Sequence, residues 1–140
     1  MTGLSLSIGQ PDMTFTTPHL EPVALFVDQD AINCYADVTG DYNPIHVDPA
    51  FAATTEMGGV IAHGTMSLNL IWQTLERTLG FDAVANLELD IRFRRPVRVG
   101  DMVTAGGALN GDGSGYAVWA RNQKDENVIE GTANLRDGGR

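Results

Sequence analysis

The sequence predicts an α+β fold in which a curved antiparallel sheet wraps around one long central helix. Two observations support this prediction. Residues 65–79 have helical spacing with apolar side chains on almost every side. The residues that follow, 87–135, alternate between apolar and polar side chains and are divided by turn-rich segments, which is typical of antiparallel strands. A helix of this kind needs protein around it, and the sheet is the available cover.

The helix expected at residues 65–79 has no charged residue from Thr65 to Leu75. Its first charges, Glu76 and Arg77, mark where we expect it to reach solvent. It is too short to cross a membrane, and Asn69 interrupts the apolar run together with other polar residues. We therefore expect a helix buried inside a globular protein.

The strand pattern begins at residues 87–93, where the period is two. A turn at Gly100-Asp101 and strands at 102–109, 116–123 and 128–135 complete an expected antiparallel meander. Another strand is expected near residues 24–27, and the alternation at 4–8 is either an edge strand or a loop. A sheet bent around a helix in this way is the hot-dog architecture. Its unpaired edges favour a homodimer.

Composition limits the classes of protein to consider. With 140 residues, one domain over 1–140 is expected. The formal net charge of −9 argues against nucleic acid as a partner. The single cysteine, Cys34, fits a reducing compartment and is expected to be buried. No stretch is long and apolar enough to span a membrane. We expect a cytoplasmic protein with no membrane partner.

A catalytic loop is predicted at residues 39–46, because Asp41 and His46 stand five positions apart in a segment too irregular for helix or strand. Gly40 permits a positive φ, and Pro44 fixes its own φ and restricts the residue before it. The loop is therefore stiff enough to hold a carboxylate and an imidazole toward one point.

Helices are expected on both sides of this loop. Asp28 or Asp30 offers an N-cap for the helix that Gly40 ends, which delivers Asp41 at a fixed point. Asp48 followed by Pro49 is typical of a second helix start. We therefore assign Asp48 a capping role rather than a catalytic one.

Residues 39–48 (TGDYNPIHVD) and 61–64 (IAHG) together resemble the signature of the MaoC-like (R)-specific enoyl-CoA hydratases, the hydratase 2 family. Residues 93–101 (FRRPVRVGD) are similar to the family's strand after the helix, so the resemblance covers about residues 28–102. It implies a hot-dog fold, a dimer, a thioester substrate and reversible hydration of a trans-2 double bond.

The resemblance also implies roles for single residues. Asp41 and His46 match the family residues that hold the catalytic water and exchange its protons. Asn43 matches the residue that helps to fix the loop, and the backbone N–H of Gly64 matches the donor to the thioester oxygen. The residues alone also place Gly64 at the start of the buried helix, where unpaired N–H groups favour negative charge.

His63 has two possible roles, contact with the substrate or support of the helix entrance, and we favour support. The thiol and imidazole content does not predict a metal site, because Asp41 and His46 lack a third ligand at a recognisable spacing. We therefore expect no metal and no cofactor.

Four of the nine basic residues, Arg92, Arg94, Arg95 and Arg98, fall within seven positions. They either bind the phosphates of coenzyme A or pair with acidic neighbours on the surface of the strand, and the sequence does not separate these interpretations. Trp72 either limits the acyl chain or belongs to the core.

Three functions remain open from the sequence. The first is the (R)-specific hydratase, or the same enzyme acting as a 3-hydroxyacyl dehydratase. The second is an acyl-CoA thioesterase of the same fold. The third is a non-catalytic acyl-CoA-binding subunit. The sequence does not fix the chain length or whether the carrier is coenzyme A or an acyl carrier protein.

Overall fold

A five-stranded antiparallel sheet forms the body of the protein. The computed structural model describes residues 14–136. The strands lie in the order β1-β3-β4-β5-β2. Their bounds are β1 Val23–Phe26, β2 Leu87–Phe93, β3 Met102–Leu109, β4 Gly115–Arg121 and β5 Asn127–Leu135. The predicted strands are confirmed to within two residues at each end, and the alternation at 4–8 lies outside the described residues.

The pairing of β2 differs from the predicted meander. β2 pairs with β5, and β3 pairs with β1 and β4, so Gly100-Asp101 does not close a hairpin between β2 and β3. The connecting residues bury Val97, whose carbonyl oxygen accepts from the Ala62 N–H at 2.8 Å. The alternation of β2 reveals a strand but not its partner, which lies far along the chain in β5.

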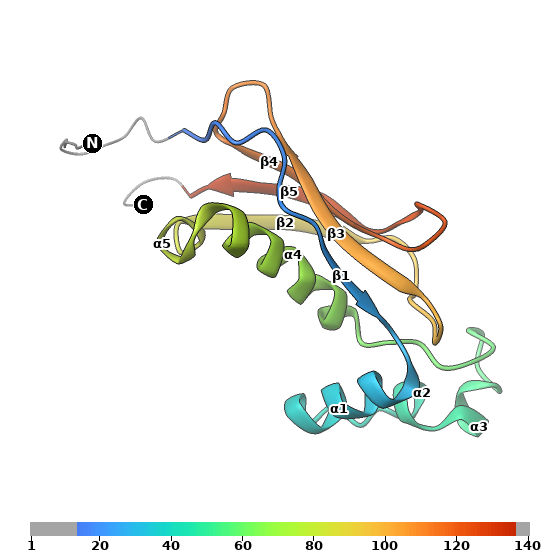
Figure 1. Ribbon diagram of the computed structural model, residues 1–140. Coiled ribbons are helices and arrows are strands. Elements are labelled where there is room, and N and C mark those ends of the chain that lie inside the picture. The colour runs from blue at the N-terminus through green and yellow to red at the C-terminus, as the bar shows by residue number, and fades with distance from the viewer. Residues whose placement is uncertain (1–13, 137–140) are drawn as a thin grey trace.

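One long helix, α4 (Gly64–Leu79), lies along one face of the sheet (Figure 1). Ile71 and Leu75 of α4 are buried against Val103, Val118 and Ile129 of the strands. This confirms the predicted α+β class with a curved sheet around a central helix.

The expectation that α4 is covered on nearly every side is wrong for this chain taken alone. Asn69, Gln73 and Glu76 are exposed, so one side of the helix faces solvent. These three residues recur at helical spacing of four and three, which places them on the side away from the sheet.

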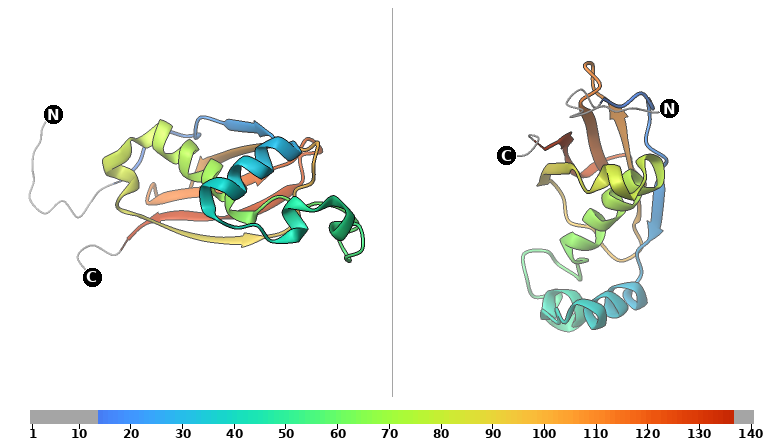
Figure 2. Two further views of the ribbon diagram at one scale, coloured as in Figure 1. Left: turned by 90° about the horizontal axis from the view of Figure 1, so that it is seen from below. Right: turned by 90° about the vertical axis from the view of Figure 1, so that its left-hand side faces the viewer.

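Within residues 14–136, three shorter helices precede α4 and lie beyond one end of it (Figures 1 and 2). α1 (Gln29–Thr39) starts where Asp28 accepts from the Ala31 N–H at 2.8 Å and stops at Gly40, with φ of 73°. α2 is Pro44–Val47 and α3 is Pro49–Ala52. α5 (Phe81–Val84) follows α4. The predicted N-cap at Asp28 and the predicted helix end at Gly40 are both confirmed.

Two smaller expectations fail. The segment around His46 is not wholly irregular, because Pro44–Val47 forms a helical turn that starts where the Asn43 side chain accepts from the Ile45 N–H at 3.1 Å. Cys34 is exposed rather than buried, and it lines an open cavity between α1, β1 and α4. Within residues 14–136, no helix has the length and apolar character needed to cross a membrane.

Candidate active site

Asp41 is held by short-range hydrogen bonds at the exit of α1. Its carboxylate accepts from the Asn43 N–H at 3.2 Å, and Asn43 in turn caps α2. Such side-chain to backbone bonds are typical of stiff turns. The side chain of Asn43 is therefore used to fix the loop, in keeping with the role that the resemblance implies.

His46 lies on α2, with its ring anchored to the chain segment before α4. Its Nδ1 atom is 2.7 Å from the carbonyl oxygen of Ile61. A carbonyl oxygen can only accept, so Nδ1 carries a hydrogen, and in the neutral ring Nε2 keeps its lone pair. Gln29 also donates to the backbone oxygen of His46 at 2.9 Å. His46 thus offers Nε2 as a fixed proton acceptor.

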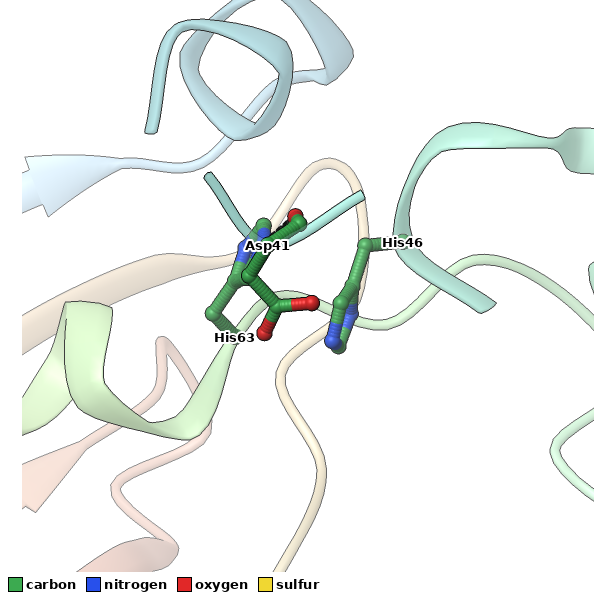
Figure 3. A group of neighbouring side chains, drawn as sticks. All are labelled: Asp41, His46 and His63. Atoms are coloured by element: carbon green, nitrogen blue, oxygen red, sulfur yellow. Dashed lines mark hydrogen bonds between the residues drawn. The ribbon is translucent and has the colours of Figure 1, made fainter. Parts of the chain in front are cut away.

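The structure brings Asp41 and His46 together, as predicted, and adds His63. The potential ligand atoms of the three side chains lie within 4.8 Å of one another. Figure 3 shows the Asp41 carboxyl group turned toward the His46 ring. The rings of His46 and His63 are stacked, with centroids 3.9 Å apart and planes 28° apart. A carboxylate and two imidazoles therefore form one cluster.

The sequence shows no third ligand at a recognisable spacing from Asp41 and His46, but the fold brings His63 next to them from a distant position in the chain. Chelation needs the in-plane lone pairs of both rings to meet at one ion. Stacked rings direct these lone pairs along nearly parallel planes, so the two imidazoles do not converge. The cluster suits proton exchange with a small polar molecule better than chelation of a cation.

Gly64 is the first residue of α4, beside this cluster. No side chain caps this helix start, so its first N–H groups have no partner within the helix. A Cβ at Gly64 would lie 2.9 Å from the Phe93 ring. Because Gly64 has no side chain, other groups can come close to its backbone N–H.

A cavity of about 360 Å³ opens beside these groups and is lined by His46, His63 and Gly64. Most of its remaining wall is apolar, and the residues that sequence reasoning missed include Ser67, Phe93, Val97 and Ile129. Ser67 is 4% exposed and stands one helical turn after Gly64, a spacing that could have revealed it. Phe93 and Ile129 come from distant strands and Val97 from the segment after β2, and these residues gave no local signal.

Arg94 and Arg95 lie at the rim of the cavity. Arg94 pairs with Glu130 at 3.4 Å, and Arg95 pairs with Glu126 at 4.0 Å. A hydrogen bond from Asn122 and the charge of Arg95 lower the pKa of Glu126. Both side chains of each pair remain well exposed, so these ion pairs are weak and can exchange partners.

The other predicted arginines and Trp72 lie outside the cavity wall. Arg92 and Arg98 do not line it. Trp72 is half-buried and packs against the hydrophobic core. Thus Asp41, His46, His63 and Gly64 come together at one place, with Arg94 and Arg95 near it, while Trp72 serves the core.

Curated relatives of this chain include proteins named dehydratases and hydratases. It is 42% identical over 69 residues to the 3-hydroxybutyryl-CoA dehydratase of Methylorubrum extorquens, covering 49% of this chain and 44% of that protein. It is 39% identical over 74 residues to the (R)-specific enoyl-CoA hydratase of Aeromonas caviae, covering 53% and 55%. The chain therefore spans about half the length of these relatives.

The fold is shared with a solved structure. The unliganded R-hydratase PhaJ1 of Pseudomonas aeruginosa superposes with a TM-score of 0.70 at 26% identity, covering 86% of this chain and 81% of that chain. This agreement confirms the predicted hot-dog fold. A family model described as MaoC like domain matches residues 9–128, most of the 140-residue sequence. The chain belongs to the MaoC-like domain family.

Proposed function

We propose that this protein catalyses the reversible hydration of a trans-2-enoyl thioester to the (R)-3-hydroxyacyl thioester. The observation that carries the proposal is that His46, which stands beside Asp41, and Gly64 at the start of α4 line one cavity. The names of the hydratase and dehydratase relatives support it.

The reaction needs a base, an acid and a site for an oxyanion. Water must lose a proton as it attacks the β carbon, the α carbon must gain one, and the enolate oxygen formed between these events must be stabilised. In the proposal, Asp41 and the Nε2 atom of His46 hold the water and take its proton. The same pair returns a proton to the α carbon.

Gly64 supplies the oxyanion site in this proposal. The free N–H groups and the positive end of the helix dipole of α4 favour the negative charge that develops on the thioester oxygen. The lack of a side chain at Gly64 lets that oxygen come close. The Asp41–His46 pair and the oxyanion site then act on opposite ends of one conjugated system.

The substrate is proposed to enter with its acyl chain along the apolar wall. The phosphates of the carrier would lie near Arg94 and Arg95, whose exposed ion pairs can open to receive them. Both coenzyme A and the phosphopantetheine arm of an acyl carrier protein bear such phosphates. Trp72 and Asn43 are not proposed as contacts, because one packs in the core and the other caps α2.

A homodimer is part of the proposal. β2 is an edge strand of the sheet, and its last residue, Phe93, is 56% exposed at the rim of the cavity. Edge strands are commonly covered by a second copy. Light scattering after size exclusion gives the mass of the assembly in solution, and a monomer would exclude this part. The cytoplasmic location expected from the single Cys34 stays a prediction.

The direct test is to mix the protein with crotonyl-CoA and longer enoyl-CoAs and to follow the ultraviolet absorbance of the conjugated thioester. Absorbance should fall, and chiral analysis should find the (R)-3-hydroxyacyl product. Asp41→Asn and His46→Gln should each lower kcat by roughly 10²- to 10⁴-fold. Release of free thiol without hydration would indicate a thioesterase. Binding without turnover would indicate a non-catalytic subunit, and both results would reject the proposal.

A further inference from the structure

We infer that His63 is a positioning residue that fixes the Asp41–His46 pair against the start of α4. This inference rests on the proposed function. It assigns His63 no contact with the substrate, although its ring forms part of the cavity wall.

The two nitrogens of His63 are unavailable to a substrate. Nε2 donates to the backbone carbonyl oxygen of Asp41 at 2.9 Å. Nδ1 is buried and has no hydrogen-bond partner among the described residues. The whole side chain is only 3% exposed. A ring held in this way acts on the residues around it rather than on a ligand.

The ring of His63 is clamped on two sides. His46 stacks on it at 3.9 Å, and the Tyr35 ring meets it edge-on at 5.0 Å. The Tyr35 hydroxyl is in turn hydrogen-bonded to the Thr65 side chain at 2.7 Å, which ties this packing to α4. His63 therefore contacts both members of the catalytic pair, Asp41 through a hydrogen bond and His46 through stacking.

The proposed site has two halves that come from separate chain segments. Asp41 and His46 belong to one segment, and Gly64 belongs to the other. The segments are joined across space by the bond from His63 to Asp41, by the bond from His46 to Ile61 at 2.7 Å, and by the Ile61 N–H to Ile45 carbonyl bond at 3.2 Å.

His63 also immediately precedes Gly64 in the chain, as the N-cap residue of α4. The Asp41 carbonyl bond therefore sets the distance between the water-holding pair and the oxyanion site. Misplacement by about 1 Å costs on the order of 10²-fold in rate. Loss of this bond should lower kcat. KM should stay unchanged, because binding of the acyl chain and of the carrier does not depend on this bond.

Three variants of His63 test the inference. His63→Gln keeps an N–H at the position of Nε2, whereas His63→Asn has an amide that reaches only the position of Nδ1. His63→Phe keeps the ring and loses the donor. We expect kcat to fall about 10- to 100-fold in H63N and H63F, with KM unchanged and with most of the rate restored in H63Q.

A double-mutant cycle tests whether His63 acts through Asp41. In the D41N background, H63F should cost little more, because positioning matters only for a functional carboxylate. Circular dichroism and thermal melting show that each variant is folded. The inference is overturned by full kcat in H63F and H63N, by a rise in KM alone, or by equal losses in H63Q and H63N.

Nuclear magnetic resonance gives a readout that does not depend on activity. His63 should carry its hydrogen on Nε2, and the carbonyl carbon signal of Asp41 should shift in H63N and return in H63Q. If the protein hydrates no enoyl thioester but these signals behave as expected, the proposed function fails while the positioning contact stands. If hydration occurs and the Asp41 signal is unmoved in H63N, the positioning inference fails.

Discussion

Phe93 occupies the space that a side chain at Gly64 would need: an added Cβ would lie 2.9 Å from the Cε1 atom of the ring. Phe93 ends β2 and Gly64 begins α4, so two distant parts of the chain meet at the rim of the cavity. The ring is 56% exposed and can turn away, which means that crowding here should disturb the site more than the fold.

Gly64→Ala should therefore lower kcat/KM by about tenfold or more while the melting temperature changes little, because the new methyl group and the displaced ring obstruct the helix start. Steady-state assays with crotonyl-CoA measure the effect. Gly111→Ala is the matched control, since a Cβ there meets nothing within 4 Å. Unchanged kinetics in G64A would argue against a thioester oxygen at this N–H.

Asp48 lies two residues after His46, yet its role is to cap α3. Its carboxylate accepts from the Phe51 N–H at 3.1 Å. Asp48→Ala should lower the free energy of unfolding by about 1 kcal/mol and leave kcat unchanged. Asp48→Asn should preserve both, because asparagine caps equally well. A loss of kcat in D48N, measured beside urea unfolding, would show that the capping assignment is incomplete.

The arginines at the rim should serve the carrier rather than the chemistry. Arg94→Gln and Arg95→Gln should each raise KM for crotonyl-CoA roughly two- to fivefold, the range of an exposed charge contact, with kcat unchanged. The effect should vanish with crotonyl-pantetheine, which lacks phosphates. Arg121→Gln is the control, because Arg121 stacks on Trp119 and does not line the cavity. Equal changes with both substrates would exclude phosphate binding here.

Tyr116 should make stability fall at alkaline pH. Its hydroxyl donates to the Thr17 carbonyl at 2.7 Å, and burial raises the pKa of Tyr116. The folded state then keeps this proton when the unfolded chain begins to lose it near pH ~10, so stability declines as pH rises above that value. Tyr116→Phe removes this decline.

Urea unfolding at neutral and alkaline pH measures the effect. Y116F should be about 1 kcal/mol less stable than the parent at neutral pH because the hydrogen bond is lost, and the gap should narrow at alkaline pH. Tyr42→Phe is a useful comparison, because a hydrogen bond from Tyr42 to Asp37 raises the pKa of the exposed Tyr42. Parallel curves for Y116F and the parent would contradict the assignment to Tyr116.

Local chemistry explains which parts of the fold were predictable. Asp28, Gly40 and Asp48 mark helix ends because capping is decided within three or four residues. The alternation at 87–93 gives the full extent of β2, because this pattern is also local. The proximity of Asp41 and His46 was also predictable, since one stiff loop carries both.

Long-range contacts explain what the sequence did not reveal. The pairing of β2 with β5 joins strands that β3 and β4 separate in the sequence, and the bond from His63 to Asp41 joins residues 22 positions apart. Ser67 lines the cavity only because the distant strands close over it. The exposure of Cys34 depends on which side of α1 packs, which composition does not tell.

The hydrogen bond between Ile45 and Ile61 has one more consequence. It closes a loop of the chain, residues 47–60, that contains α3, begins after His46 and returns at Ile61. The hydrogen bonds at the base of this loop keep the two halves of the site in place, and the chain around the loop does not. Insertions or deletions near Glu56 would therefore change the length of this loop and leave the spacing of the reacting groups intact.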